Sequence, residues 1–252
     1  MPKLPDFISI IIPGYNEEKR IARSLTALSA FCDTHFGPYE ILFVNDGSTD
    51  KTQEMVESLR LPSLRTLHLE PNQGKGAAVR AGMLAAQGDY RFFTDADLPY
   101  DLSAFVEAMR LFHSIRCDGV VGARDLPESS DQSGPTPLRK LTSRCFSALV
   151  RALLHVDIKD TQCGFKGFTA PAAEALFSLS SLSGYAFDVE LFLLAKTRNL
   201  KIGKVPVRLI ERHHSKARLS LDAPMMFWEV IKLKRRCKVH GARYPEPPPT
   251  PK

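Results

Sequence analysis

Two aspartates separated by one residue, Asp95 and Asp97, directly follow a short aromatic stretch at Tyr90-Arg91-Phe92-Phe93. The aromatic residues fit a buried strand, and Pro99 prevents that strand from continuing. In parallel α/β sheets, ligands bind at the carboxyl ends of the strands. An all-oxygen Asp-x-Asp site there suits Mg²⁺ or Mn²⁺ on a diphosphate. In a surface turn the same tripeptide is an ordinary turn. Other motifs in the chain are therefore needed to choose between a metal site and a turn.

The loop Pro13-Gly14-Tyr15-Asn16-Glu17 lies between the first predicted strand, 7–13, and the first predicted helix. A ligand-facing loop at this place can use Tyr15 to stack on a base and Glu17 to accept a hydrogen bond. The alternative is an ordinary turn in which Asn16 caps the helix.

The second and third predicted strands, 39–44 and 64–69, end in loops of the same kind. After the second strand, Asp46 can accept from a base N–H, with an ordinary turn as the alternative. After the third, the glycines of Asn72-Gln73-Gly74-Lys75-Gly76 permit a phosphate to approach, and Lys75 offers a cation. Four successive strand ends therefore carry polar residues of the ligand-binding type, which favours one shared site over four unrelated turns.

The predicted elements alternate along the chain. Strands are expected at 7–13, 39–44, 64–69, 90–93, 118–123 and 164–168, and helices at about 17–31, 50–59, 74–86, 102–112, 137–153, 186–197 and 222–237. The segment 202–210 is expected to be an edge strand, because Pro206 interrupts its ladder. Residues 125–137 are rich in turn residues and predict a loop. This alternation indicates an α/β fold with a mainly parallel sheet.

Composition limits the class of protein. A chain of 252 residues suits one large α/β domain, or a domain with a small appendage. The five cysteines are odd in number and include no Cys-x-x-Cys, so neither a disulfide framework nor a zinc site is expected. The amino terminus lacks a signal-peptide layout, and no run of about 18 apolar residues predicts a membrane-spanning helix. These features favour the cytoplasm.

The net charge of +6 is unevenly placed, because residues 201–240 are dense in Lys, Arg and His. Such a segment implies an anionic partner: a phosphate, a lipid surface or a nucleic acid. The predicted helix 222–237 also carries aromatic and apolar residues beside its basic cluster, which suits a helix lying on an anionic membrane. The alternative is a helix that packs on the core with a solvated basic end.

The four strand-end motifs, in this order and spacing, resemble glycosyltransferase family 2, whose fold is the nucleotide-diphospho-sugar GT-A fold. Three later motifs are similar to those of enzymes that put a sugar on a polyprenyl phosphate, the dolichyl-phosphate glucose and mannose synthases. These motifs are Asp160-Thr161-Gln162-Cys163-Gly164-Phe165-Lys166, Phe187-Asp188-Val189-Glu190-Leu191 and His214-Ser215-Lys216. The first two are closer to the glucosyl branch, which favours UDP-glucose over GDP-mannose as donor.

The resemblance implies one GT-A domain over residues 1–238, with peripheral amphipathic helices towards its carboxyl end. Its donor half is expected at about 7–124 and its acceptor half at about 125–238. Residues 239–252 are Pro-rich and are expected to be a disordered tail. The implied product is a β-linked sugar phosphate, formed with inversion by an enzyme bound peripherally on the cytosolic face of a membrane.

The resemblance also implies site residues. Those expected to hold the nucleotide sugar are Pro13, Tyr15, Glu17, Asp46, Lys75, Asp95 and Ala96. Asp97, together with Asp95, is expected to coordinate Mg²⁺ or Mn²⁺, because a cation stabilises the charge of the leaving diphosphate. Arg124 is expected to face the same phosphates. The chain departs from the family pattern at Leu98-Pro99-Tyr100, where such synthases often carry a polar residue, so further metal ligands are not evident.

The residues expected to bind the acceptor phosphate are Arg139, Arg212, Ser215 and Lys216. A phosphate monoester has a second pKa of about 6, so its oxygen is mostly anionic near neutral pH and needs no dedicated general base. Asp160 and Asp188 join Asp97 and Arg124 as the expected catalytic residues. They and Glu190 would orient the cations or the sugar, and the alternative for each is a structural ion pair.

Other functions explain the sequence less well. A nucleotidyltransferase should carry a glycine-rich loop with Arg or Lys after its first strand, which the 13–17 loop lacks. A transferase with a soluble acceptor, such as a sugar or a phosphoglycerate, stays open. A nucleic-acid-binding module would explain the basic charge but not the acidic strand ends, so no nucleic-acid partner is expected.

Overall fold

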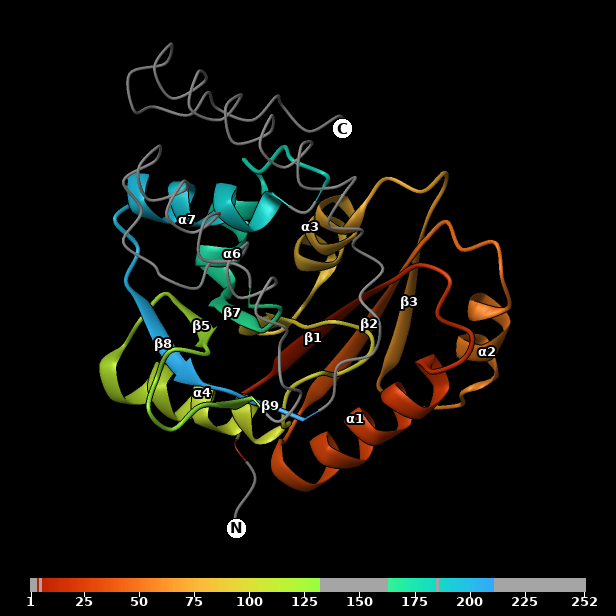
Figure 1. The fold of residues 1–252 in the computed structure, drawn as a ribbon, viewed down its shortest axis with the longest axis horizontal. Helices are drawn as coiled ribbons and strands as arrows, with labels where there is room; N and C mark the ends of the chain where they lie inside the picture. The colour runs from red at the N-terminus through yellow and green to blue at the C-terminus, as the bar shows by residue number, and fades with distance from the viewer. Residues whose placement is uncertain (1–3, 5, 132–162, 185, 211–252) are drawn as a thin grey trace.

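The computed structural model describes residue 4 and residues 6–131, 163–184 and 186–210 (Figure 1). Its strands are β1 Ile8–Gly14, β2 Tyr39–Asp46, β3 Leu64–Leu69, β4 Tyr90–Phe93, β5 Gly119–Ala123, β6 Ser130–Asp131, β7 Lys166–Thr169, β8 Ile202–Pro206 and β9 Arg208–Leu209. Its helices are α1 Ile21–His35, α2 Thr52–Ser58, α3 Lys75–Ala85, α4 Ser103–Ile115, α6 Ala170–Phe177 and α7 Phe187–Thr197. The alternation predicted for 7–123 is confirmed.

Seven strands form the central sheet in the order β3-β2-β1-β4-β7-β5-β8. All neighbouring strands in this sheet are parallel except β7, which runs antiparallel to both β4 and β5. The sheet is therefore mainly parallel, as predicted. The insertion of β7 beside β4 brings a late segment of the chain next to the Asp-x-Asp motif.

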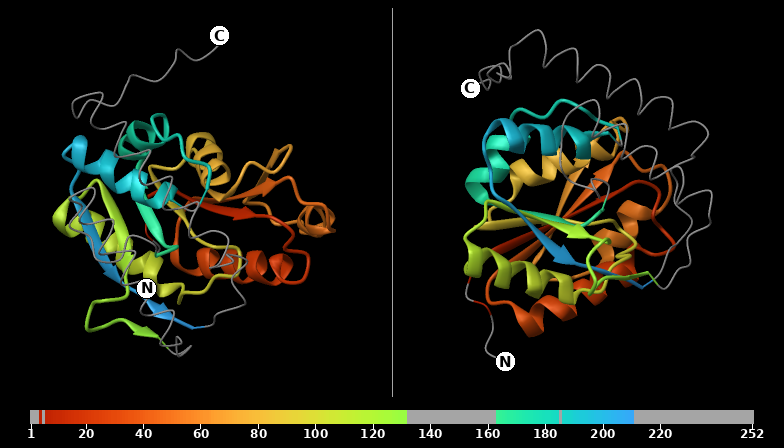
Figure 2. Two further views of the ribbon diagram at one scale, coloured as in Figure 1. Left: turned by 45° about the horizontal axis from the view of Figure 1, so that its top comes forward. Right: turned by 60° about the vertical axis from the view of Figure 1, so that its left-hand side comes forward.

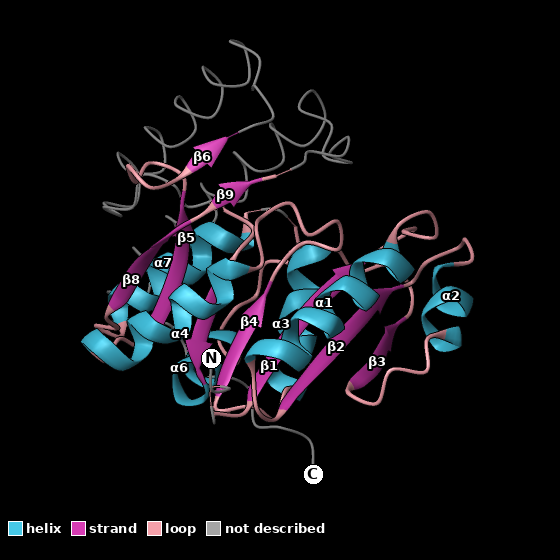
Figure 3. Ribbon diagram, turned by 90° about the horizontal axis from the view of Figure 1, so that it is seen from below, coloured by secondary structure: helices cyan, strands magenta, loops and turns pink. Residues whose placement is uncertain are grey.

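Helices cover both faces of the sheet (Figures 1 and 2). Ile8, Ile10 and Ile12 of β1 belong to the core cluster that contains the buried residues of α1 and α4. Ile11 points to the opposite face, into the cluster formed with α3 and α6. A central strand buried on both faces explains the continuous isoleucine run. Figure 3 shows the short β6–β9 pair beyond the end of the central sheet.

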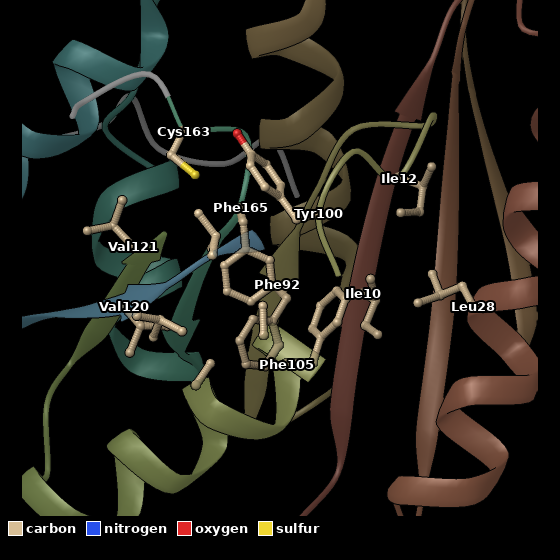
Figure 4. Close-up of a cluster of buried hydrophobic side chains, with 14 of the residues drawn as sticks. Ile10, Ile12, Leu28, Phe92, Tyr100, Phe105, Val120, Val121, Cys163 and Phe165 are labelled. Carbon is tan, nitrogen blue, oxygen red and sulfur yellow. The ribbon is translucent and has the colours of Figure 1, made fainter. Parts of the chain in front are cut away.

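A cluster of aromatic rings joins β4, α4 and the segment before β7 (Figure 4). The rings of Phe92 and Phe105 lie 5.3 Å apart between centroids, and those of Phe105 and Phe165 lie 4.9 Å apart, both in edge-to-face geometry. Phe92 immediately precedes Phe93, the last residue of β4. This packing fixes the end of the strand from which the Asp-x-Asp motif projects.

Pro13 does not end the first strand, contrary to the sequence analysis, because β1 pairs with β2 as far as Gly14. The Ile11 carbonyl accepts a hydrogen bond from the Thr94 N–H at 3.1 Å, so positions 11 and 13 both face the β4 side. β4 ends at Phe93, opposite Ile11. Proline at position 13 therefore removes no ladder hydrogen bond.

The structure also departs from the predicted elements in its second half. α6 is absent from the predicted elements, although Thr169 accepts a hydrogen bond from the Ala172 N–H and Pro171 lies in the first turn, as is typical of a helix start. The predicted edge strand 202–210 is at the sheet edge as β8, and it stops at Pro206. β9 then pairs with β6, which lies inside the predicted loop 125–137.

The predicted helices at 137–153 and 222–237 and the tail at 239–252 lie outside the described residues. Among the helices that are described, none combines the length and hydropathy required of a membrane span.

Candidate active site

The loops after β1 and β2 meet at the carboxyl edge of the sheet, because these strands are parallel neighbours. The Asn16 side-chain carbonyl accepts from the Thr49 N–H at 2.8 Å, and the Glu17 N–H donates to Thr52 Oγ1 at 2.6 Å. Asn16 has a φ of 55°, in the left-handed region that asparagine tolerates. Asn16 therefore joins two loops and does not cap α1, whose N-cap residue is Arg20.

Asp46, the last residue of β2, is buried, and its carboxylate accepts three hydrogen bonds from the loop before α3. The donors are the Asn72 side-chain amide at 2.9 Å and the backbone N–H groups of Gln73 at 2.8 Å and Gly74 at 2.9 Å. Asp46 therefore fixes the loop that leads into Lys75. Its expected contact with a base stays a prediction.

Lys75, the first residue of α3, forms an ion pair with Asp95 of the Asp-x-Asp motif. Gly164 lies against the same carboxylate so closely that a Cβ at this position would collide with Asp95 Oδ2. The glycine of the Asp-Thr-Gln-Cys-Gly-Phe-Lys motif is therefore required by close approach to Asp95. The structure thus brings together three motifs that are far apart in the sequence.

Arg20 links the first loop to the second aspartate. Its Nε lies 2.5 Å from Glu17 Oε2, and its Nη1 lies 3.8 Å from Asp97 Oδ2. Arg20 is not among the site residues expected from the sequence. The spacing of Glu17 and Arg20 was the available signal, because side chains three residues apart at the start of a helix lie close together. Glu17 was already an expected site residue.

Burial raises the pKa of the Asp97 carboxyl above its usual range, and the neighbouring Asp95 carboxylate raises it further, whereas Arg20 lowers it. Two crowded carboxylates of this kind fit a hard cation, since both offer the oxygen ligands that Mg²⁺ and Mn²⁺ prefer. Over the described ranges, no group of three or more His, Cys, Asp or Glu side chains is arranged to hold a metal ion. The two aspartates fit a cation that completes its coordination with diphosphate oxygens and water.

Tyr100 lies where the family pattern predicts a polar residue near the aspartates. Its side chain is buried beside Cys163 (Figure 4). Burial raises the pKa of the Tyr100 phenol well above its ordinary value, Cys163 raises it further, and the charge of Arg124 lowers it. Arg124, exposed directly after β5, is therefore within electrostatic reach of the site.

Asp188, in the first turn of α7, forms a buried ion pair with Lys166 of β7, with Nζ and Oδ1 2.7 Å apart. Lys166 also donates to the Cys163 carbonyl at 2.6 Å. Burial raises the pKa of the Asp188 carboxyl, while the charges of Lys166 and Lys75 lower it. This arrangement matches the structural ion pair weighed in the sequence analysis, and a catalytic role for Asp188 stays a prediction.

Comparison with known proteins identifies the family. The model of "Glycosyl transferase family 2" matches residues 9–177. A dolichyl-phosphate beta-glucosyltransferase of Trichomonas vaginalis is 36% identical over 225 residues, which cover 85% of this chain and 67% of that protein. Another of the same name, from Dictyostelium discoideum, is 34% identical over 244 residues, covering 91% of this chain and 74% of that protein. The chain belongs to glycosyltransferase family 2.

Solved structures agree on the fold of this family 2 glycosyltransferase. It is similar to glucosyl-3-phosphoglycerate synthase from Mycobacterium tuberculosis in complex with UDP, with a TM-score of 0.67 and 21% identity, over 92% of this chain and 80% of that one. A complex of the same synthase with Mn²⁺, UDP and glucosyl-3-phosphoglycerate gives a TM-score of 0.64 at 21% identity, over 94% and 80% of the two chains. The predicted GT-A fold is confirmed.

The remaining expected site residues of this family 2 glycosyltransferase differ in placement. Pro13 and Ala96 are buried, and Tyr15 is 38% exposed at the carboxyl edge of β1. The expected residues that lie outside the described ranges are Asp160, Arg139, Arg212, Ser215 and Lys216. The role of each of these residues stays a prediction.

Proposed function

We propose that this family 2 glycosyltransferase moves glucose from UDP-glucose to dolichyl phosphate. The observation that carries the proposal is the activity named for relatives at 34–36% identity over most of this chain. The site supports it chemically, since Lys75, Asp95 and Asp97 gather charged groups at the sheet edge where nucleotides bind in α/β folds.

The donor would lie along this carboxyl edge. Tyr15 offers an exposed ring for stacking on the base, and Lys75 offers a cation beside the diphosphate. Asp97 and Asp95 would hold Mg²⁺ or Mn²⁺, because their two neighbouring carboxylates offer the oxygen ligands that these cations prefer. A bound cation of this kind supplies positive charge where the leaving diphosphate becomes more negative.

The reaction would be a single displacement. An acceptor phosphate oxygen forms a bond to the anomeric carbon of glucose while the bond to UDP breaks, so the configuration at that carbon inverts and the product is β-linked. Since the second pKa of a phosphate monoester is about 6, the acceptor oxygen is already mostly anionic near neutral pH. We expect Arg139, Arg212, Ser215 and Lys216 to hold that phosphate.

A lipid acceptor requires contact with a membrane. The aromatic and basic residues at 222–237 would lie on an anionic, cytosolic-facing leaflet, so the protein is expected to bind the membrane peripherally. Flotation with phosphatidylserine vesicles tests this contact, and the absence of any affinity for anionic vesicles would contradict it.

Transfer assays with a donor and acceptor panel test the activity. UDP-glucose, UDP-galactose and GDP-mannose are each supplied with Mn²⁺ and with dolichyl phosphate, 3-phosphoglycerate or no acceptor. We expect glucosyl transfer only from UDP-glucose to dolichyl phosphate, with a β-configured product by NMR. Turnover of GDP-mannose or of 3-phosphoglycerate in place of these substrates would contradict the proposal, and an α-configured product would exclude single displacement.

A further inference from the structure

The first turn of α7 carries two buried carboxylates, Asp188 and Glu190, that face different segments of the chain. Glu190 is fully buried. Its Oε2 accepts from the backbone N–H groups of Ser181 and Leu182, both at 2.9 Å, and its Oε1 accepts from Ser181 Oγ at 2.8 Å. Glu190 therefore fixes the segment 181–184, which has no regular secondary structure of its own.

The segment 181–184 packs against the start of α3. The Gly76 N–H donates to the Ser183 carbonyl at 2.7 Å. A Cβ on Gly74 would lie 2.6 Å from the Ser183 carbonyl oxygen, and one on Gly76 would lie 2.5 Å from that of Leu182. These two glycines are thus required by the 181–184 backbone. Their expected role in letting a phosphate approach stays a prediction. The residue between them is Lys75.

Asp188 supports Asp95, the ion-pair partner of Lys75. Through Lys166, which donates to the Cys163 carbonyl, it fixes the residue directly before Gly164. Gly164 in turn lies against the Asp95 carboxylate. The two acidic residues of α7 therefore each support a different partner of the Lys75–Asp95 pair, Glu190 through 181–184 and Asp188 through Lys166.

We infer that Asp188 and Glu190 are positioning residues, which hold Lys75 and Asp95 in the geometry that binds the donor diphosphate. This inference rests on the proposed function, because it assigns the pair to the donor site. A small shift of a positioned group weakens binding or catalysis without touching the substrate.

Glu190 offers the sharper test, because the three hydrogen bonds described above join it to neutral groups. In Glu190→Gln the amide oxygen can still accept from the backbone N–H groups, and the amide N–H can donate to Ser181 Oγ, so the segment keeps its bonds. In Glu190→Ala those donors lose their acceptor. We expect the KM for UDP-glucose, and the dissociation constant of UDP with Mn²⁺ by calorimetry, to rise about tenfold in Glu190→Ala and to stay near wild type in Glu190→Gln.

Glu40 provides the matched control. It is also a buried carboxylate that accepts from a serine hydroxyl and a backbone N–H, those of Ser9 and Gln87, but it lies near the opposite end of β2 from the site. Glu40→Ala is expected to lower the melting temperature with donor KM unchanged. Ser181→Ala removes one bond to Glu190 and serves where Glu190→Ala folds poorly, with an expected rise in KM of about threefold.

The outcomes separate the two claims. If the wild-type protein binds UDP and transfers glucose, but Glu190→Ala and Ser181→Ala lose only thermal stability and keep the wild-type donor KM, the positioning role is wrong and the proposed function stands. If the wild type neither binds UDP nor transfers glucose, both claims fail.

Discussion

Carboxylates lie at both the amino and the carboxyl ends of the strands of the central sheet, but the groups that surround Glu40 and Asp97 differ. Near the amino end of β2, Glu40 accepts from Ser9 Oγ at 2.6 Å and from the Gln87 N–H at 2.7 Å, and it forms an ion pair with Arg65. At the carboxyl end, burial raises the pKa of Asp97 and the nearby Asp95 carboxylate raises it further, while the Arg20 Nη1 is 3.8 Å from Asp97 Oδ2. The first arrangement favours stability, whereas the second keeps negative charge in place for a ligand.

The largest expected effect is on catalysis at the carboxyl end. Asp97→Asn keeps the side-chain shape but removes the charge that would hold a cation. We expect glucosyl transfer to fall by at least about a hundredfold, as for loss of other groups that stabilise charge in a transition state. Circular dichroism and urea unfolding check that the variant is folded. Near-wild-type turnover in the folded variant would show that Asp97 holds no essential cation.

At the amino end the same kind of change should affect stability alone. Glu40→Ala leaves the Ser9 hydroxyl and the Gln87 N–H without their acceptor, so the free energy of unfolding should fall by about 1–3 kcal/mol. Urea denaturation measures this change, and steady-state assays on the folded enzyme should give kcat and donor KM within about twofold of wild type. A large loss of activity would mean that the two ends of the sheet are not independent.

Gly164→Ala tests how closely the residues around Asp95 pack at the carboxyl end of the sheet. The new Cβ would displace the Asp95 carboxylate, so kcat/KM is expected to fall about tenfold. Gly203→Ala is the matched control, because its Cβ would lie 2.7 Å from the end of the Leu111 side chain, in a part of the core that holds no expected site residue. Equal losses of activity in the two variants would indicate a general packing defect.

The smallest expected effect is on the pH dependence of stability. Because the pKa of Asp97 is raised in the folded protein, the folded state keeps this proton at pH values where the unfolded chain has released it. The free energy of unfolding of the unliganded protein should therefore decrease as pH rises from the ordinary range of an aspartate, near 4, through the raised pKa. Asp97→Asn lacks this contribution.

Urea unfolding of both proteins between about pH 4 and pH 7, without divalent cations, measures the difference. The asparagine variant is expected to gain stability relative to wild type as pH rises across this window. A constant difference between the two proteins would show that Asp97 has an ordinary pKa in the folded state.

The first half of the fold followed from local patterns. The isoleucine run of β1 and the aromatic residues of β4 each predicted what is observed, because strand burial leaves a strong signal in neighbouring residues. The antiparallel insertion of β7 between β4 and β5 left no such signal, since strand order depends on contacts between distant segments.

The candidate active site also combines features that the sequence predicted with contacts that it did not. Residue types and their positions after strands predicted the acidic and basic groups at the carboxyl edge, namely Asp46, Lys75, Asp95 and Asp97. They did not predict that Asp46 holds the 72–74 loop, that Arg20 lies near Asp97, or that Glu190 supports 181–184. Each of these contacts joins a loop to another loop, to a strand end or to a helix, so only the packed chain determines which polar group a donor meets.

The sequence by itself determined the chemistry available to this protein: oxygen ligands, a cation and an aromatic residue, each following a strand of a mainly parallel sheet. Only the tertiary structure decided which of these groups pair with one another and which buried carboxylates support them. The physical reason is that a side chain's type fixes what it can donate or accept, while its partner depends on where the fold places residues that are remote in the chain.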